Sequence, residues 1–267
     1  MSALTLELIE MPDQRLDLSP LMPARLAGLK PKEIEALPIG TTRVPLVVGD
    51  LFKLKGKDAG ALRLIGTDAR CDRIGRALAE GKILVDGDAG AYLGAGMKGG
   101  EVTLTGGAGQ AAGASMAGGR IEIAGDVGER AGGVLVGEAF GMRGGLMTVG
   151  GNAGSMLGER MRRGLILVNG KAGDYAGARL IAGTLLIMGK VGPFAGYGLR
   201  RGSLILAHKP KDVMPTFGDC GVLDFNYLRL LGRQLRALGL AVKLGHRARR
   251  LMGDMAVLGK GEMLILA

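Results

Sequence analysis

Few residues of this 267-residue chain could do chemistry. It has two cysteines, Cys71 and Cys220, and two histidines, His208 and His246. Nucleophilic catalysis needs a nucleophile beside a base, and metal sites need several His, Cys, Asp or Glu side chains together. The cysteines lie in no CxxC motif, and two histidines are too few for a histidine-based metal site or a catalytic triad. The sequence therefore predicts no catalytic residue and no metal site.

Cys71 stands between Arg70 and Asp72, with Arg73 next, and positive neighbours can lower the pKa of a thiol. We nevertheless predict a buried, inert cysteine, because no base or second cysteine accompanies it. His208 is interpreted as a structural residue at a turn, and His246 as a solvated residue among arginines.

Two phosphate-binding motifs are rejected. Residues 94–99 match the dinucleotide fingerprint G-x-G-x-x-G, but that motif must open a helix, whereas this segment leads into a further predicted strand. Lys171, Lys190 and Lys260 each follow a glycine, but none is followed by Ser or Thr as a P-loop requires.

The elements around these residues come from a tandem repeat of 19 residues. In each block the fourth position is apolar, the seventh is glycine, and two apolar residues separated by one residue follow, as in Met97, Gly100, Val102 and Leu104. Such alternation predicts a strand with one buried face. A Gly-x-[Ala/Val]-Gly motif then turns the chain into the next block. The blocks begin at Gly75, Gly94, Gly113, Ala139, Gly158, Gly177 and Gly196.

We therefore predict a mainly β fold, a β-helix solenoid of about seven coils over residues 61–209. The 50 glycines and the aromatic content of 3% fit a narrow, regular interior. One spacing of 26 adds seven residues, which we place within Gly133–Ala139 as a side loop.

Both ends differ from the repeat. Residues 1–60 predict an α/β cap, with a strand at Leu4–Ile9 and short helices around Ala24–Leu29 and Lys32–Leu37. Residues 210–267 predict a closing segment with an amphipathic helix that Asp224 caps and Gly239 ends. Its apolar stripe comprises Phe225, Leu228, Leu231, Leu235 and Leu238. We expect this helix to close the solenoid or to bind a partner subunit.

The net charge of +10 is uneven, because residues 197–250 hold eleven Lys/Arg against three Asp/Glu. The candidate contact residues for an anionic partner are Arg200, Arg201, Arg247, Arg249 and Arg250. No stacking aromatics or known motif accompany them, so nucleic-acid binding is not expected. The chain shows no secretory or transit peptide and no apolar run near the about 20 residues that span a bilayer. We therefore expect a cytoplasmic protein that binds no membrane.

Several segments resemble a known family. The repeat, Met214–Gly221 and Arg250–Glu262 are similar to the C subunit of formylmethanofuran dehydrogenases, and Lys32–Leu37 and Val48–Phe52 fit the same family. The repeat alone is similar to the C-terminal domain of the glutamate synthase large subunit. The resemblance implies a right-handed β-helix that is a non-catalytic scaffold, bound to other subunits that carry the chemistry.

The resemblance also implies a reaction. In methylotrophic bacteria, a formyltransferase/hydrolase complex moves a formyl group from formyl-tetrahydromethanopterin to a methanofuran-like carrier and releases formate during formaldehyde oxidation. The alternatives are a tungsten or molybdenum formylmethanofuran dehydrogenase of archaea and a glutamate synthase-like module. A composition rich in Ala, Gly, Arg and Leu favours the bacterial complex. We expect this chain to bind no cofactor itself. The arginine candidates would contact an acidic partner subunit or the acidic tail of the carrier.

Overall fold

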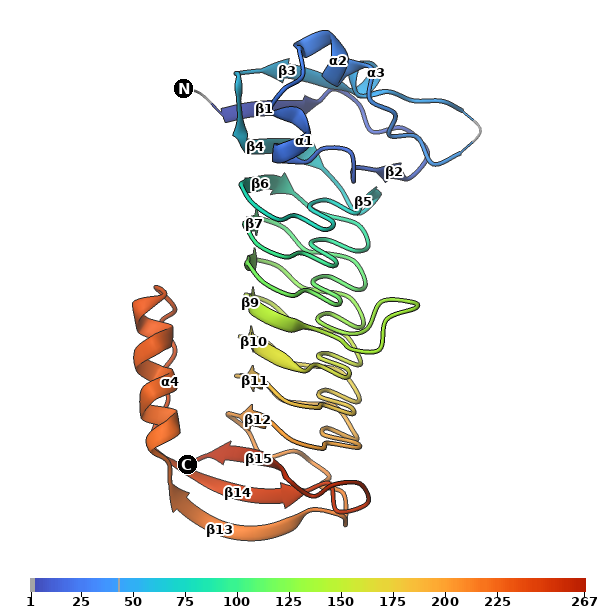
Figure 1. Cartoon of the computed structure of the whole chain (residues 1–267). Helices are drawn as coiled ribbons and strands as arrows, with labels where there is room; N and C mark the ends of the chain where they lie inside the picture. The colour runs from blue at the N-terminus through green and yellow to red at the C-terminus, as the bar shows by residue number, and fades with distance from the viewer. Residues whose placement is uncertain (1–2, 43) are drawn as a thin grey trace.

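The chain is mainly β in a computed structural model that describes residues 3–42 and 44–267 (Figure 1). Thirteen strands form one mixed sheet in the order β13-β14-β15-β12-β11-β10-β9-β8-β7-β6-β4-β1-β3, and β2 and β5 form a second, two-stranded sheet. The central strands run parallel. They are β4 (Asp58–Thr67), β6 (Lys82–Gly87), β7 (Glu101–Leu104), β8 (Arg120–Ile123), β9 (Arg143–Val149), β10 (Arg163–Val168), β11 (Thr184–Ile187) and β12 (Ser203–Leu206).

Each repeat lies directly on the one before it. Val102 on β7 pairs with Ile121 on β8, and Ile166 on β10 pairs with Leu185 on β11, so the register advances by one repeat per strand. A second ladder of parallel bridges follows the turns after the strands. It joins Ala89, Ala108, Val127, Ala153, Ala172 and Val191. Most backbone groups of a repeat are therefore satisfied by its neighbours, which a single repeat could not provide.

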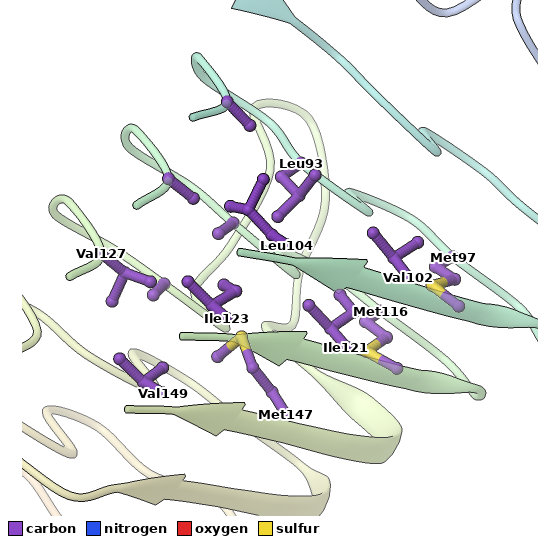
Figure 2. Close-up of a cluster of buried hydrophobic side chains, with 14 of the residues drawn as sticks. Leu93, Met97, Val102, Leu104, Met116, Ile121, Ile123, Val127, Met147 and Val149 are labelled. Carbon is purple, nitrogen blue, oxygen red and sulfur yellow. The ribbon is translucent and has the colours of Figure 1, made fainter. Parts of the chain in front are cut away.

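The interior of the stack is the row of apolar positions that the repeat predicts. Met97, Val102 and Leu104 of one repeat are at most 1% exposed, and their equivalents in the other repeats are buried as well. Figure 2 shows these side chains from successive repeats pointing into one shared interior. Burying one such side chain stabilises the fold by about 1.5–3 kcal/mol, so the core grows with each added repeat.

The predicted block start at Ala139 is wrong. Its structural equivalent is Gly132, whose φ of +66° matches that of Gly113 at +62°, and Ala139 is exposed. The corner needs a left-handed backbone, which glycine adopts without a steric penalty. The seven extra residues are 134–140, after this corner, one residue later than predicted. Counting the block start backwards from buried Met142 concealed this, because the insertion lies between Gly132 and Met142.

The N-terminal segment covers one end of the stack (Figure 1). Strand β1 (Ala3–Leu8) pairs parallel with β4 and antiparallel with β3 (Phe52–Lys55), and the short strands β2 (Leu16–Asp17) and β5 (Cys71–Asp72) pair with each other. The predicted strand is confirmed within one residue.

Three short helices complete the N-terminal segment: α1 (Pro23–Leu26), α2 (Pro31–Glu35) and α3 (Val48–Leu51). Proline opens α1 and α2, where its missing N–H costs nothing. The two predicted helices are confirmed with shorter bounds, and α3 was not predicted.

Three strands cover the other end of the stack. Strand β15 (Gly261–Leu266) is parallel to β12, and β14 (Arg247–Gly253) and β13 (Gly218–Asp224) follow antiparallel. The buried carboxylate of Asp254 joins this end to the last repeat by accepting the N–H of Gly198 at 3.0 Å. Burial alone would raise the pKa of Asp254, but its hydrogen bonds outweigh that effect and lower it.

The predicted C-terminal helix exists as α4 (Asn226–Ala237), with Gly239 just beyond it at a φ of +78°. Two features of the prediction are wrong. Phe225, not Asp224, is the capping residue, because Asp224 still pairs with Arg247 in the sheet. The helix also does not close the end of the stack, which β13–β15 cover, but lies along its side (Figure 1). The other alternative, that the helix binds a partner subunit, stays a prediction.

An outward-facing apolar stripe explains where α4 lies. The middle residue of each strand faces away from the core; it is the half-buried Leu84 in the first repeat and polar in the next three, at Thr103, Glu122 and Thr148. In later repeats the same position is Leu167, Leu186 and Ile205, all at most 1% exposed. These residues form a second core with Leu228, Leu231 and Leu235 of α4. The helix packs where the sheet presents an apolar outer face, since exposing that face to water would be costly.

Candidate interaction surface

The structure does not bring the two cysteines and the two histidines together into one site. Cys71 is fully buried and Cys220 is exposed. Burial raises the pKa of the Cys71 thiol to about 11, so it stays neutral near pH 7. The predicted burial of Cys71 is confirmed, and its lack of reactivity stays a prediction. His208 is exposed at its turn, and His246 lies 3.2 Å from a carboxylate oxygen of Asp224.

We expect one of the two thiols to react with a thiol reagent in the native protein and both to react in denaturant. Burial and a raised pKa both suppress the thiolate that reacts. Titration at pH 8 with Ellman's reagent, repeated on Cys220→Ser, checks this. Rapid native labelling of Cys220→Ser would contradict the assignment.

The structure also describes the segment that matches the dinucleotide fingerprint. Residues 94–99 form left-handed turns that lead into β7, so no helix N-terminus faces them. No group of three or more His, Cys, Asp or Glu side chains that could hold a metal ion occurs among residues 3–42 and 44–267. Within the same residues, no helix has the length and apolar character needed to cross a membrane.

The five predicted contact arginines do not form one patch. Arg200 and Arg201 lie in the turn before β12, whereas Arg247 begins β14. Because β14 runs antiparallel to β15, which is parallel to β12, Arg247 lies at the opposite end of these strands. Arg249 and Arg250 form ion pairs within the chain, with Asp219 at 2.9 Å and Glu262 at 3.1 Å. Only Arg200 and Arg201 remain adjacent, exposed and outside such pairs among the described residues.

These two arginines belong to a larger set that we call the arginine ridge. Its members lie either at the first residue of a strand or in the turn that precedes the strand, in four successive repeats. They are Arg143, Arg160, Arg162, Arg163, Arg179, Arg200 and Arg201. Residues 142–202 contain nine Lys/Arg against two Asp/Glu, whereas residues 61–141 contain eight against ten. The positive charge of the stack is therefore concentrated in its later repeats.

Backbone hydrogen bonds hold the ridge residues in register. The N–H of Arg162 donates to the carbonyl oxygen of Met142, and the N–H of Arg200 donates to that of Leu180. Arg143 pairs with Arg163 across the sheet. Neighbouring strands are about 4.8 Å apart, so like charges at one corner repel each other.

Earlier repeats balance their charges instead. Lys82 lies 2.8 Å from Glu101 of the next repeat. Within the described residues, the ridge forms one salt bridge, between Arg143 and Glu138 at a long 3.9 Å. Five of its members were missed from the sequence because charge was summed over long segments. Counting charge by position within the repeat would have found them.

The insertion loop, residues 134–140, adjoins the ridge and projects from the stack on the side away from α4 (Figure 1). The hydroxyl of Ser115, which is 1% exposed, donates to the carbonyl oxygen of Phe140 at 2.9 Å and accepts the N–H of Leu135 at 3.1 Å. The guanidinium of Arg162 lies 4.8 Å from the centre of the Phe140 ring. The ends of the loop are thus fixed, and its tip presents Val136 fully exposed.

We expect Ser115→Ala to loosen this loop without unfolding the stack. The change leaves one N–H and one carbonyl without a partner, at a cost of about 1–3 kcal/mol. Hydrogen exchange of residues 134–140 should rise, while β6 to β8 keep their protection. Ser155→Ala, in the next repeat, is the control. Unchanged exchange in the loop would contradict the clamp.

These features define a stacked-repeat protein whose distinctive surface is a row of arginines beside a fixed loop. No family model matches the sequence. Over 80 residues it is 43% identical to the C subunit of the formyltransferase/hydrolase complex of Methylorubrum extorquens, an alignment that spans 30% of this chain and 30% of that protein.

A solved structure extends the similarity to nearly the whole chain. It is the crystal structure of the formyltransferase/hydrolase complex FhcABCD of Methylorubrum extorquens with methylofuran. One of its chains aligns with 98% of this chain and 99% of its own length, at a TM-score of 0.91 and 42% identity. The chain belongs to the family of C subunits of formyltransferase/hydrolase complexes. The resemblance noted in the sequence is thereby confirmed.

Proposed function

We propose that this chain is the non-catalytic scaffold subunit of a formyltransferase/hydrolase complex. The complex would transfer a formyl group from formyl-tetrahydromethanopterin to a methanofuran-like carrier and hydrolyse the product to formate. The observation that carries the proposal is the similarity along nearly the whole chain to a member of such a complex. The partners are then the other subunits, which would use the carrier and tetrahydromethanopterin, while this chain binds no cofactor itself.

A scaffold role agrees with the physics of the stack. Each repeat is bonded to two neighbours along two ladders, so its shape depends little on loops. Such a rigid body can hold partner subunits at fixed separations. We further propose that the stack is a right-handed β-helix over residues 61–209, between an N-terminal cap (1–60) and a C-terminal segment (210–267). A cytoplasmic location is part of the same proposal.

Co-purification tests this function. The tagged chain, expressed in its native host, should retain the formyltransferase and hydrolase subunits, identified by mass spectrometry. The assembled complex should release formate from formylated carrier, and the chain alone should release none. Formate release by the chain alone would overturn the scaffold role. Co-purification with a tungsten or molybdenum subunit, or with a glutaminase subunit, would replace the assignment by the corresponding alternative.

A further inference from the structure

Next to the arginine ridge lie three aromatic side chains, the half-buried Tyr175 and the exposed Phe194 and Tyr197, which we call the aromatic trio. The ring centres of Tyr175 and Phe194 are 4.9 Å apart in a stacked arrangement, and Tyr197 meets Tyr175 edge-on at 5.9 Å. Phe194 is 48% exposed and Tyr197 is 44% exposed. In a chain with nine Phe and Tyr residues and no Trp, three of the nine gather at this one place.

The backbone places part of the ridge next to the trio. The N–H of Arg179 donates to the carbonyl oxygen of Tyr197, which places this arginine beside the trio. Arg200 and Arg201 follow three and four residues after Tyr197, at the same corner of the stack. Arg179, Arg200 and Arg201 are all exposed.

The fold does not require aromatic residues in these positions. Tyr175 and Phe194 have left-handed φ angles of 58° and 59°, a conformation that suits glycine better than a bulky side chain. Other repeats place different residues in this conformation at the same position: Arg73, Tyr92, Ala111, Arg130 and Met156. The left-handed conformation is therefore a property of the repeat, and the aromatic side chains are what distinguishes these two copies.

We infer that the ridge and the trio together dock a carboxylate-rich face of a neighbouring subunit, an inference that rests on the proposed function. Arginines that lack carboxylate partners within their own chain are complemented by Asp and Glu side chains of another chain. Arginine and tyrosine are also the residue types that dominate binding energy at protein interfaces. The trio argues for a folded partner, because a flexible polyanion would use the arginines without needing an apolar anchor.

The test uses the whole complex, purified with variant chains and diluted while mass photometry measures the intact fraction across a salt series. In the ridge variant Arg200→Glu/Arg201→Glu, we expect dissociation at about 100-fold higher complex concentration at low salt, and a weaker salt dependence. The control, Lys171→Glu/Lys190→Glu, makes the same charge change at exposed lysines in the turns after the strands. It should shift dissociation by less than about threefold.

The trio variant Phe194→Asn/Tyr197→Ser should shift dissociation about tenfold at every salt concentration, because the contact it removes is apolar. Asparagine tolerates the left-handed backbone at position 194. Unchanged melting temperatures of the free variants would show that they fold.

Wild-type stability of the complex in both the ridge and trio variants would overturn the docking inference while the scaffold function stands. If the ridge variant lost binding to added poly-L-glutamate while assembly of the complex stayed unchanged, the docking inference would also be overturned. The ridge would then bind a flexible polyanion and not a folded subunit. Failure of the wild-type chain to join any complex would overturn both the inference and the proposed function.

Discussion

Gly119→Ala is expected to lower the free energy of unfolding by about 2–5 kcal/mol. Gly119 is the seventh residue of its repeat and has a φ of +87°. A Cβ there would lie 2.7 Å from the carbonyl oxygens of both Gly99 and Gly100 in the preceding repeat. The left-handed backbone costs a non-glycine residue about 1–2 kcal/mol. Overpacking against an immobile backbone adds about 1–3 kcal/mol.

Denaturant unfolding followed by circular dichroism measures this effect. The control is Gly28→Ala, because a Cβ at Gly28 would meet no atom within 4 Å. Its effect should stay within about 0.5 kcal/mol. Equal denaturation midpoints for the two variants would show that the close approach between repeats is not the reason why glycine is needed at position 119.

Leu186→Asp is expected to release α4 from the side of the stack. Leu186 is fully buried and packs with Leu231 and Leu235 of the helix in the second core, which is the outer core because it lies on the outward face of the sheet. Losing a buried leucine costs about 2–5 kcal/mol, and a carboxylate without a partner in an apolar site adds to that cost. The inner core is on the opposite face of the strand, so the repeats should remain stacked.

Hydrogen exchange with mass spectrometry measures both effects. Residues 226–237 should lose protection by about 100-fold, the equivalent of nearly 3 kcal/mol, while β6 to β9 stay protected. Thr148→Asp is the matched control, since Thr148 holds the equivalent outward position of an earlier repeat and is half-buried. Loss of protection throughout the stack, or no change in α4, would contradict the assignment of separate inner and outer cores.

Much of the architecture could be predicted because its determinants are local and periodic. The alternation of Ile166 and Val168, and of their equivalents, identifies an inward face in any strand that obeys a period of two. The buried residues found are the predicted ones, and the absence of a base near Cys71 indicated an inert thiol. The terminal motifs, rather than the repeat, identified the family.

The mistakes arose where pairing over long distances overrides local preference. Asp224 is a good capping residue in isolation, but pairing with Arg247 keeps it in a strand. The insertion was predicted one residue too early, because its corner is defined by contacts between repeats. The position of α4 depends on the outward stripe at Leu167, Leu186 and Ile205, a signal present in the sequence but readable only once inward and outward positions are separated.

The sequence by itself determined the repeat, its inward-facing residues and the glycine positions, because each depends on periodicity along the chain. Only the tertiary structure decided which arginines share a surface. Residues 19 positions apart become neighbours at about 4.8 Å when repeats stack. Stacking places Arg200 and Arg201 two repeats from Arg162 and Arg163 at the same repeat positions, with Ile181 and Ala182 between them. The reversed direction of β14 separated Arg247 from them, because strand direction is fixed by pairing and not by composition.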